Sequence, residues 1–190
     1  RLKHRMYVVG AYLFSGEELD IYLKAQKRAA LDVAARAKDG KDEEFSSLDP
    51  ADQVRAIYDR FAIPDTSMHV DKAAFVDERP LTIEECDAIK APEEDRAKHK
   101  AITIAIPYSG DIHLLVDRPT IYSAHQPQAD IRDGVMNLIW FMNEVEEPQL
   151  ENNFKRQIAL IERTLEVTQW QSMGANQEMM AELKAVLLPA

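Results

Sequence analysis

The stretch ADIRDGVMNLIWFMNEV, residues 129–145, restricts the possible folds of this chain more than any other part of it. A two-residue type I′ turn needs φ > 0 at both central positions, and Asp133-Gly134 is a pair that meets this need. After the turn, residues 135–142 alternate with the period of a strand. One side of that strand is apolar throughout and consists of Met136, Leu138, Trp140 and Met142. The sequence therefore predicts a β-hairpin in a sheet that has one face on the core and one toward water.

Further strands are expected ahead of this hairpin. Residues 101–108, AITIAIPY, have the β-branched content of a strand. The next letters, SGD, are turn residues, and IHLLV, residues 112–116, is expected to return as a second strand. Together with the hairpin, these segments predict a four-stranded antiparallel sheet over about residues 101–146.

Two helices are expected before the sheet. Ser15 and Glu18 have the spacing of a capping box, which predicts a helix over residues 15–38. Asp49 followed by Pro50 is typical of the first positions of a second helix. The acidic stretch APEEDRAKHK, further along, predicts a solvated loop.

Residues 148–188 have a helical period. Their apolar seam advances in steps of four and three and consists of Leu150, Phe154, Ile158, Ile161 and Leu165. As one rod, the segment would extend about 60 Å at roughly 1.5 Å per residue, and a rod of that length needs another chain to pack on. A bend near Gly174, where QWQSMGANQ weakens the seam, would instead form a helical hairpin over the sheet. We favour the bend because glycine destabilises a helix interior.

These elements define an α+β fold with N-terminal helices, a four-stranded antiparallel sheet, and a C-terminal helical hairpin or long helix. No Gly/Ser/Pro-rich linker divides the chain, so we expect a single domain over residues 1–190. Within it, residues 1–100, mainly helical, and residues 101–190 could form two lobes. The first residue is Arg, and we expect the chain to be a fragment of a longer protein.

The charge of the chain is acidic and uneven. The formal net charge is −10, and residues 41–100 carry nine Lys and Arg against sixteen Asp and Glu. A nucleic-acid groove needs clustered basic residues, so nucleic-acid binding by this segment is disfavoured.

No apolar run reaches the roughly 18 residues that a membrane span requires, and we expect no membrane association. The single cysteine, Cys86, cannot form an internal disulfide, which fits a reducing cytoplasm.

One short stretch carries groups with catalytic potential. SGDIH, residues 109–113, places Asp111 and His113 on one side of the expected strand, and His125 follows about one loop later. These three residues would give a metal site that activates water for hydrolysis. The alternative, which we favour, is that Asp111 is a turn residue and His113 a half-exposed strand position. Ser109 lacks the flanking glycines of a nucleophile elbow, and no glycine-rich phosphate loop is present, so no cofactor is expected.

The C-terminal helical segment offers a contact surface instead of a catalytic one. Trp170 stands where the seam weakens, and tryptophan is enriched at binding hot spots. Aromatic and methionine residues such as Trp170 are more often part of a core, and that alternative stays open. Trp170 is the best candidate for an interface anchor beside the seam of Leu150, Phe154, Ile158, Ile161 and Leu165. The expected partner is protein, either another domain or a second copy in a homo-oligomer.

Three segments, IPYSGD, LLVDRPTIYS and QPQADIRDG, are followed by a strand and a long helical tail. This arrangement, over about residues 100–180, resembles an accessory domain of uncharacterised bacterial multidomain proteins of the effector or signalling type. The resemblance implies an accessory rather than a catalytic role, and it carries over no catalytic residues.

We therefore expect a non-catalytic protein-protein interaction or oligomerisation module of a larger cytoplasmic bacterial protein. Two alternatives stay open. One is a metal-dependent hydrolase that uses Asp111, His113 and His125, and the other is a small-ligand sensor with a pocket between the sheet and the helices.

Overall fold

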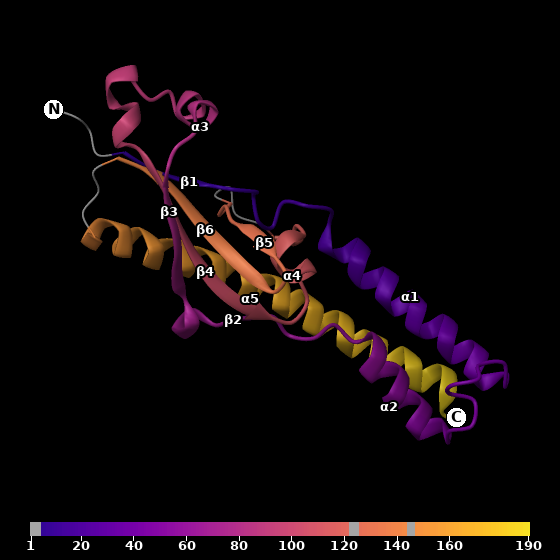
Figure 1. Ribbon diagram of the computed structural model, residues 1–190. Coiled ribbons are helices and arrows are strands. Elements are labelled where there is room, and N and C mark those ends of the chain that lie inside the picture. The colour runs from indigo at the N-terminus through magenta and orange to yellow at the C-terminus, as the bar shows by residue number, and fades with distance from the viewer. Residues whose placement is uncertain (1–4, 122–125, 144–146) are drawn as a thin grey trace. The chain divides into compact units, whose positions relative to one another are not determined.

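The computed structural model describes residues 5–121, 126–143 and 147–190 and has an α+β fold, with an antiparallel sheet and a long C-terminal helix (Figure 1). The chain forms two compact units, and each is built from segments that are separated in the sequence. The described parts of the first unit are 5–15, 66–110, 126–143 and 147–164. Those of the second unit are 16–65, 111–121 and 165–190.

The first unit contains a six-stranded sheet, where the sequence predicted four strands. The strands are β1 Met6–Val9, β2 Ser67–Met68, β3 Ala74–Pro80, β4 Lys100–Ser109, β5 Asp130–Arg132 and β6 Val135–Met142. Their order is β1-β6-β4-β2, with β3 also paired to β4 and β5 to β6, and every pairing is antiparallel. The additional strands β1, β2 and β3 come from the N-terminal half, which we had expected to be mainly helical.

The hairpin predicted at Asp133-Gly134 is confirmed. The φ angles of these residues are 49° and 77°, and the turn pairs Arg132 with Val135 across β5 and β6. The alternation along β6 is also confirmed, because its predicted core side chains are buried. In the middle of that face, the Trp140 Nε1 donates a hydrogen bond of 2.8 Å to the Asn153 Oδ1 of the helix α5 (Glu147–Leu187).

The segment IHLLV is not a strand, and this prediction was wrong. Residues His113–Val116 form a single helical turn, α4. The carboxylate of Asp111 accepts a hydrogen bond of 2.9 Å from the His113 backbone N–H, a local bond that competes with strand pairing. The neighbouring Leu114 and Leu115 are both fully buried, which a half-covered strand does not allow.

Three short helical turns lie between the strands of the first unit, and the last of them falls within the stretch expected to be an acidic loop. These turns are η1 Val70–Lys72, α3 Ile83–Ala88 and η2 Glu93–Lys98. At the start of α3, Thr82 Oγ1 accepts a hydrogen bond of 3.2 Å from the Glu85 backbone N–H. His99 is buried, and its Nδ1 lies 2.8 Å from the Asp95 carbonyl oxygen, so the stretch APEEDRAKHK is not a solvated loop.

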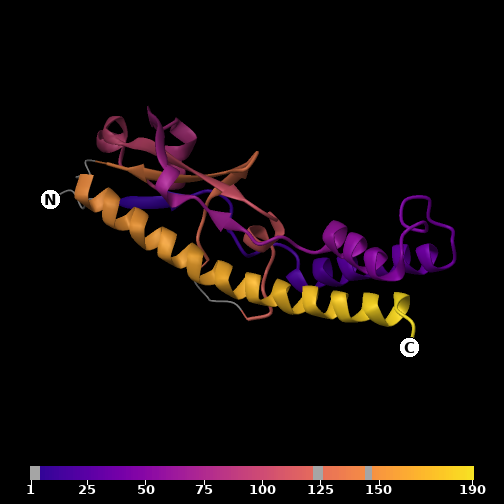
Figure 2. The ribbon, with the colours of Figure 1, turned by 90° about the horizontal axis from the view of Figure 1, so that it is seen from below.

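The second unit is helical. The helices α1 (Leu19–Lys38) and α2 (Pro50–Phe61) lie alongside the C-terminal end of α5, drawn in yellow in Figure 2. Small side chains of α1 pack there with larger ones from the other helices, and the fully buried members are Ala30, Ala34, Ile57, Met179 and Leu183. The start predicted for the second helix is confirmed, because α2 begins at Pro50 with Asp49 before it.

The helix α1 starts four residues later than the capping box predicted. Ser15 Oγ donates to the Tyr12 carbonyl oxygen at 2.6 Å instead of capping a helix. At the observed start, the Leu19 N–H donates to the Arg118 carbonyl oxygen at 2.9 Å. A contact between segments distant in the sequence therefore satisfies one of the orphan N–H groups at the start of this helix.

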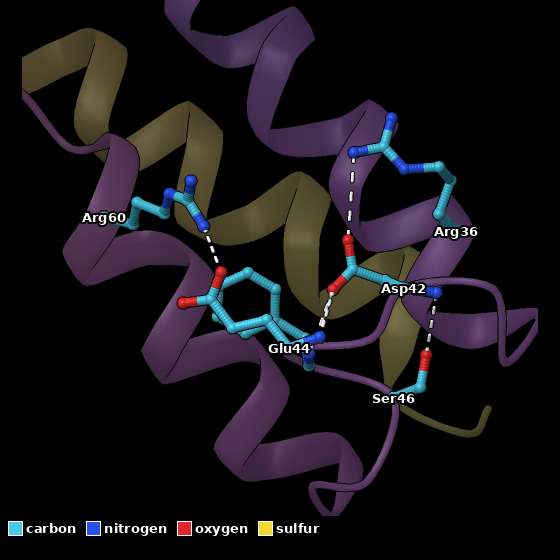
Figure 3. A network of polar contacts seen from close by, with 6 residues as sticks. Arg36, Asp42, Glu44, Ser46 and Arg60 are labelled. Atoms are coloured by element: carbon cyan, nitrogen blue, oxygen red, sulfur yellow. Dashed lines mark hydrogen bonds and ion pairs between the residues drawn. The ribbon is translucent and has the colours of Figure 1, made fainter.

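Polar contacts order the connection between α1 and α2 (Figure 3). The Asp42 carboxylate accepts hydrogen bonds of 3.0 Å from the backbone N–H groups of Glu44 and Phe45 and lies 3.8 Å from the Arg36 guanidinium. The Asp42 N–H donates to Ser46 Oγ at 3.1 Å, and Arg60 forms an ion pair with Glu44. The loop is thus held by its own side chains and by one residue from each helix.

The bend predicted near Gly174 is wrong, because α5 is one helix over Glu147–Leu187. Contacts fasten it on both sides of the glycine. Thr168 Oγ1 donates to the Leu114 carbonyl oxygen at 2.7 Å, and the Asn176 amide bonds both the N–H and the carbonyl oxygen of Ile63 at 2.9 Å. These bonds outweigh the roughly 1 kcal/mol that glycine costs in a helix interior.

Among the described residues, no helix combines the length and the apolar character that crossing a membrane requires.

Candidate functional site

An apolar groove lies in the second unit, between α5 and the loop that follows α4. Its volume is about 440 Å³, and it is lined by Thr120, Ile121, Val167, Trp170, Gln171, Met173, Gly174 and Gln177. This volume is within the range of about 300–1,000 Å³ of typical ligand and side-chain pockets. The groove is open to solvent along α5, so it can receive a side chain from outside.

Large apolar side chains of this groove face water. Trp170 is 78% exposed, Ile121 77% and Met173 51%. A single exposed apolar residue is ordinary on a protein surface, whereas adjacent ones mark a contact site. Burying the exposed part of one tryptophan, at 150–250 Å² per buried side chain and 25 cal/mol per Å², would be worth about 3–5 kcal/mol as an upper estimate.

Two hydrogen bonds fix the loop against the helix. The Thr120 N–H donates to Gln171 Oε1 at 3.1 Å, and Gln171 Nε2 donates to Thr120 Oγ1 at 3.1 Å. The same helix turns its other side inward, where Leu165, Thr168 and Ser172 are buried. The orientation of α5 is therefore set by its inner contacts, and Trp170 is left on the outer face.

Among the residues that the structure describes, the lining of the groove carries no charged side chain. Residues 167–177, VTQWQSMGANQ, contain no Asp, Glu, Lys or Arg, although 29% of the chain is charged. Its polar groups are the amides and hydroxyl of Gln171, Gln177 and Thr120. None of the described lining residues is a general acid, a general base or a strong metal ligand at neutral pH. What these residues can do is bind an apolar group.

The sequence-predicted residues Asp111 and His113 lie in a second cluster, at the contact of α4 with α1. Tyr22 OH donates to Asp111 Oδ2 at 2.5 Å, and the rings of Tyr22 and His113 stack with centroids 3.7 Å apart. Burial, followed by the bond to and the charge of Asp111, raises the pKa of Tyr22. The His113 Nδ1 lies 2.7 Å from the carboxylate of Asp117, and because a carboxylate only accepts, this nitrogen carries the proton.

These contacts give Asp111 and His113 structural partners at the start of a helix, rather than the shared strand face expected of a metal-ligand pair. The third residue of the predicted metal site, His125, lies outside the described residues. Within the described part of the chain, no group of three or more His, Cys, Asp and Glu side chains is arranged to hold a metal ion. The metal-dependent hydrolase remains a prediction.

Ser109 has a partner that its local sequence did not indicate. His69 Nε2 lies 3.1 Å from Ser109 Oγ, at the exposed end of β4 where β2 pairs with it. A serine acts as a nucleophile when its histidine is oriented by a third group. Among the hydrogen bonds of the described residues, none joins the His69 ring to a carboxylate, so this pair does not form a triad.

The predicted interface residues have two different environments. Ile158, Ile161 and Leu165 are buried by the chain itself, whereas Leu150 and Phe154 are partly buried. Trp170, the predicted anchor, is exposed on the groove. Sequence reasoning missed Ile121, Val167 and Gly174 as its neighbours. The signal for the α5 part of the groove was the uncharged run from 167 to 177, most of which we interpreted only as a weakening of the apolar seam.

Comparison with known proteins finds no family model that matches this chain, and no curated protein or solved structure that is significantly similar to it. The function is therefore inferred from the sequence and the structure of this chain.

Proposed function

We propose that this chain is a non-catalytic protein-protein interaction module and that the groove beside Trp170 is its contact surface. The observation that supports this proposal is the exposure of Trp170, Ile121 and Met173 around one uncharged groove. Interface cores are depleted in charge and enriched in aromatic residues and methionine, and this groove has that composition.

The proposed surface is narrower than the predicted one. Because Ile158, Ile161 and Leu165 are buried, polar substitutions there would disturb folding before they disturb association. The outer face of α5 between residues 167 and 177 takes their place, with Trp170 retained as the anchor.

The wider setting that we propose is an accessory domain of a larger cytoplasmic bacterial protein. Its supports are the resemblance of residues 100–180, the negative charge and the single buried cysteine, Cys86. In this setting the domain contributes contacts, and catalysis belongs to another part of the protein.

Site-specific photo-crosslinking in cells tests the proposed function. A benzophenone side chain is placed at Gln177, on the groove, or at Lys155, an exposed position of α5 outside it. We expect a discrete crosslinked protein adduct from position 177 that is weak or absent from position 155. The Trp170→Ser substitution should reduce the adduct. If position 177 gives no protein adduct above that of position 155, the proposed function is wrong.

A further inference from the structure

The spacing of the groove residues on α5 is a palindrome. Val167, Trp170, Gly174 and Gln177 are separated by steps of three, four and three residues. If two such helices run antiparallel and cross midway between Trp170 and Gly174, each Trp170 faces the other helix's Gly174. In the same register, each Val167 faces the other Gln177. Every groove position of this set therefore meets another member of the set.

The paired positions also fit in size. Trp170 is the largest side chain of the groove, and Gly174, one turn along the same face, is the smallest. At Gly174, apart from the adjoining residues and the nearby backbone of the same helix, no described atom lies within 4 Å of the place that a Cβ would take. In the terms of helix packing, Trp170 is therefore a knob, and the open space at Gly174, one turn away, is a hole. An antiparallel copy places each knob over the hole of its partner, as an isologous two-fold interface requires.

The distribution of charge also favours a second copy of the chain as the partner of this groove. Two copies with a net charge of −10 each repel one another over most of their surface. Residues 167–177 contribute no charge to this repulsion, and a second copy brings an equally uncharged surface to them. Pairing residues 167–177 of two copies therefore desolvates no charged side chain of these segments, a cost that a charged partner would have to meet.

We propose that the groove binds a second copy of this chain, with Trp170 of each copy seated over Gly174 of the other in an antiparallel, two-fold α5 pair. This inference rests on the proposed function, whose partner it names. The partner copy completes the site, because each groove receives its indole from the other chain.

Sedimentation velocity on the full chain over a range of concentrations tests this dimer. We expect a reversible monomer-dimer equilibrium that raised salt strengthens, because salt screens the like charges. Trp170→Ser should raise the dimer dissociation constant at least tenfold. Gly174→Leu should raise it similarly without lowering the melting temperature, because the added side chain blocks the hole, leucine is favoured over glycine in a helix interior, and a Cβ at this position has open space around it. Phe75→Ser, which removes another exposed aromatic side chain, is the control and should leave the constant unchanged.

Disulfide trapping tests the register. In a Cys86→Ala background, a mixture of Val167→Cys and Gln177→Cys chains should form the mixed disulfide faster than either forms a disulfide with itself. A parallel pair would reverse this preference and contradict the inference.

The outcomes separate the two proposals. A parent chain that stays monomeric at every attainable concentration, or a dimer that is indifferent to both groove substitutions, overturns the second-copy inference. If photo-crosslinking at position 177 then captures a different protein, the proposed function stands and only its partner is corrected. If that position captures nothing, both proposals fail.

Discussion

Replacing Gly174 by alanine should stabilise this protein, and the sign of the change depends on α5 being continuous. Gly174 has no positive φ, and a Cβ built there meets no described atom within 4 Å. In a helix interior, alanine is more favourable than glycine by about 0.8–1 kcal/mol. For a protein of this length, that gain should raise the melting temperature by about 2–4 °C. A chain that turned at Gly174 in a left-handed conformation would instead be destabilised by alanine.

The measurement is urea unfolding followed by circular dichroism at the helix band. Trp170→Ser is used as the background in both proteins, so that any self-association does not enter the comparison. Equal slopes with a higher midpoint for the alanine protein would confirm the expected gain. A midpoint lower than that of the glycine protein would refute a continuous helix through this residue.

Three further predictions follow from contacts within each unit. Ile161→Ala should destabilise the protein by about 2–5 kcal/mol in urea unfolding, because Ile161 is fully buried, and a change below 1 kcal/mol would contradict that burial. Asn176→Ala should cost about 1–3 kcal/mol in the same assay, since it leaves both backbone groups of Ile63 without their amide partner, and no loss would mean that the bridge does not form. Burial and Asp111 raise the pKa of Tyr22 above its usual value of 10.0. The neutral phenol therefore stabilises the folded state fully below pH 10.0, and this contribution to the free energy of unfolding declines as the pH rises above 10.0. Tyr22→Phe should make that decline shallower in urea titrations, and equal declines in both proteins would contradict the assigned cause.

Local rules of chain geometry were sufficient for the parts of the fold that the sequence predicted. The type I′ turn at Asp133-Gly134 needs positive φ at two adjacent residues, and few pairs satisfy this. Pro50 after Asp49 started a helix for an equally local reason, because the first helical position needs no N–H group. Along β6, the period of two was long enough to identify the buried face.

Contacts between distant residues decided the parts that were missed. The strand β1 pairs with β6 from more than 120 positions away, and its short sequence carries no strong signal of its own. The run at 112–116 is too short for its period to separate a strand from a helix, and the hydrogen bond that the His113 N–H donates to the Asp111 carboxylate favours the helical turn. Gly174 stays helical because the contacts of Thr168 and Asn176 hold the helix on both sides.

For a similar reason, the sequence predicted only one part of the candidate site. Trp170 was recognisable because it is a tryptophan outside the apolar seam. The groove also needs Ile121, which the bonds between Thr120 and Gln171 bring to the helix from 51 residues away. No pattern within either segment indicates that they meet.

Acrylamide quenching of Trp170 as a function of protein concentration tests the central claim most directly. Trp140 is fully buried, so the difference between the parent and Trp170→Phe isolates the emission of Trp170. We expect this emission to be strongly quenched in dilute protein and progressively protected as the concentration rises and a second copy covers the indole. Weak quenching at high dilution would mean that the chain buries Trp170 itself, and quenching that is strong and independent of concentration would mean that no second copy binds there.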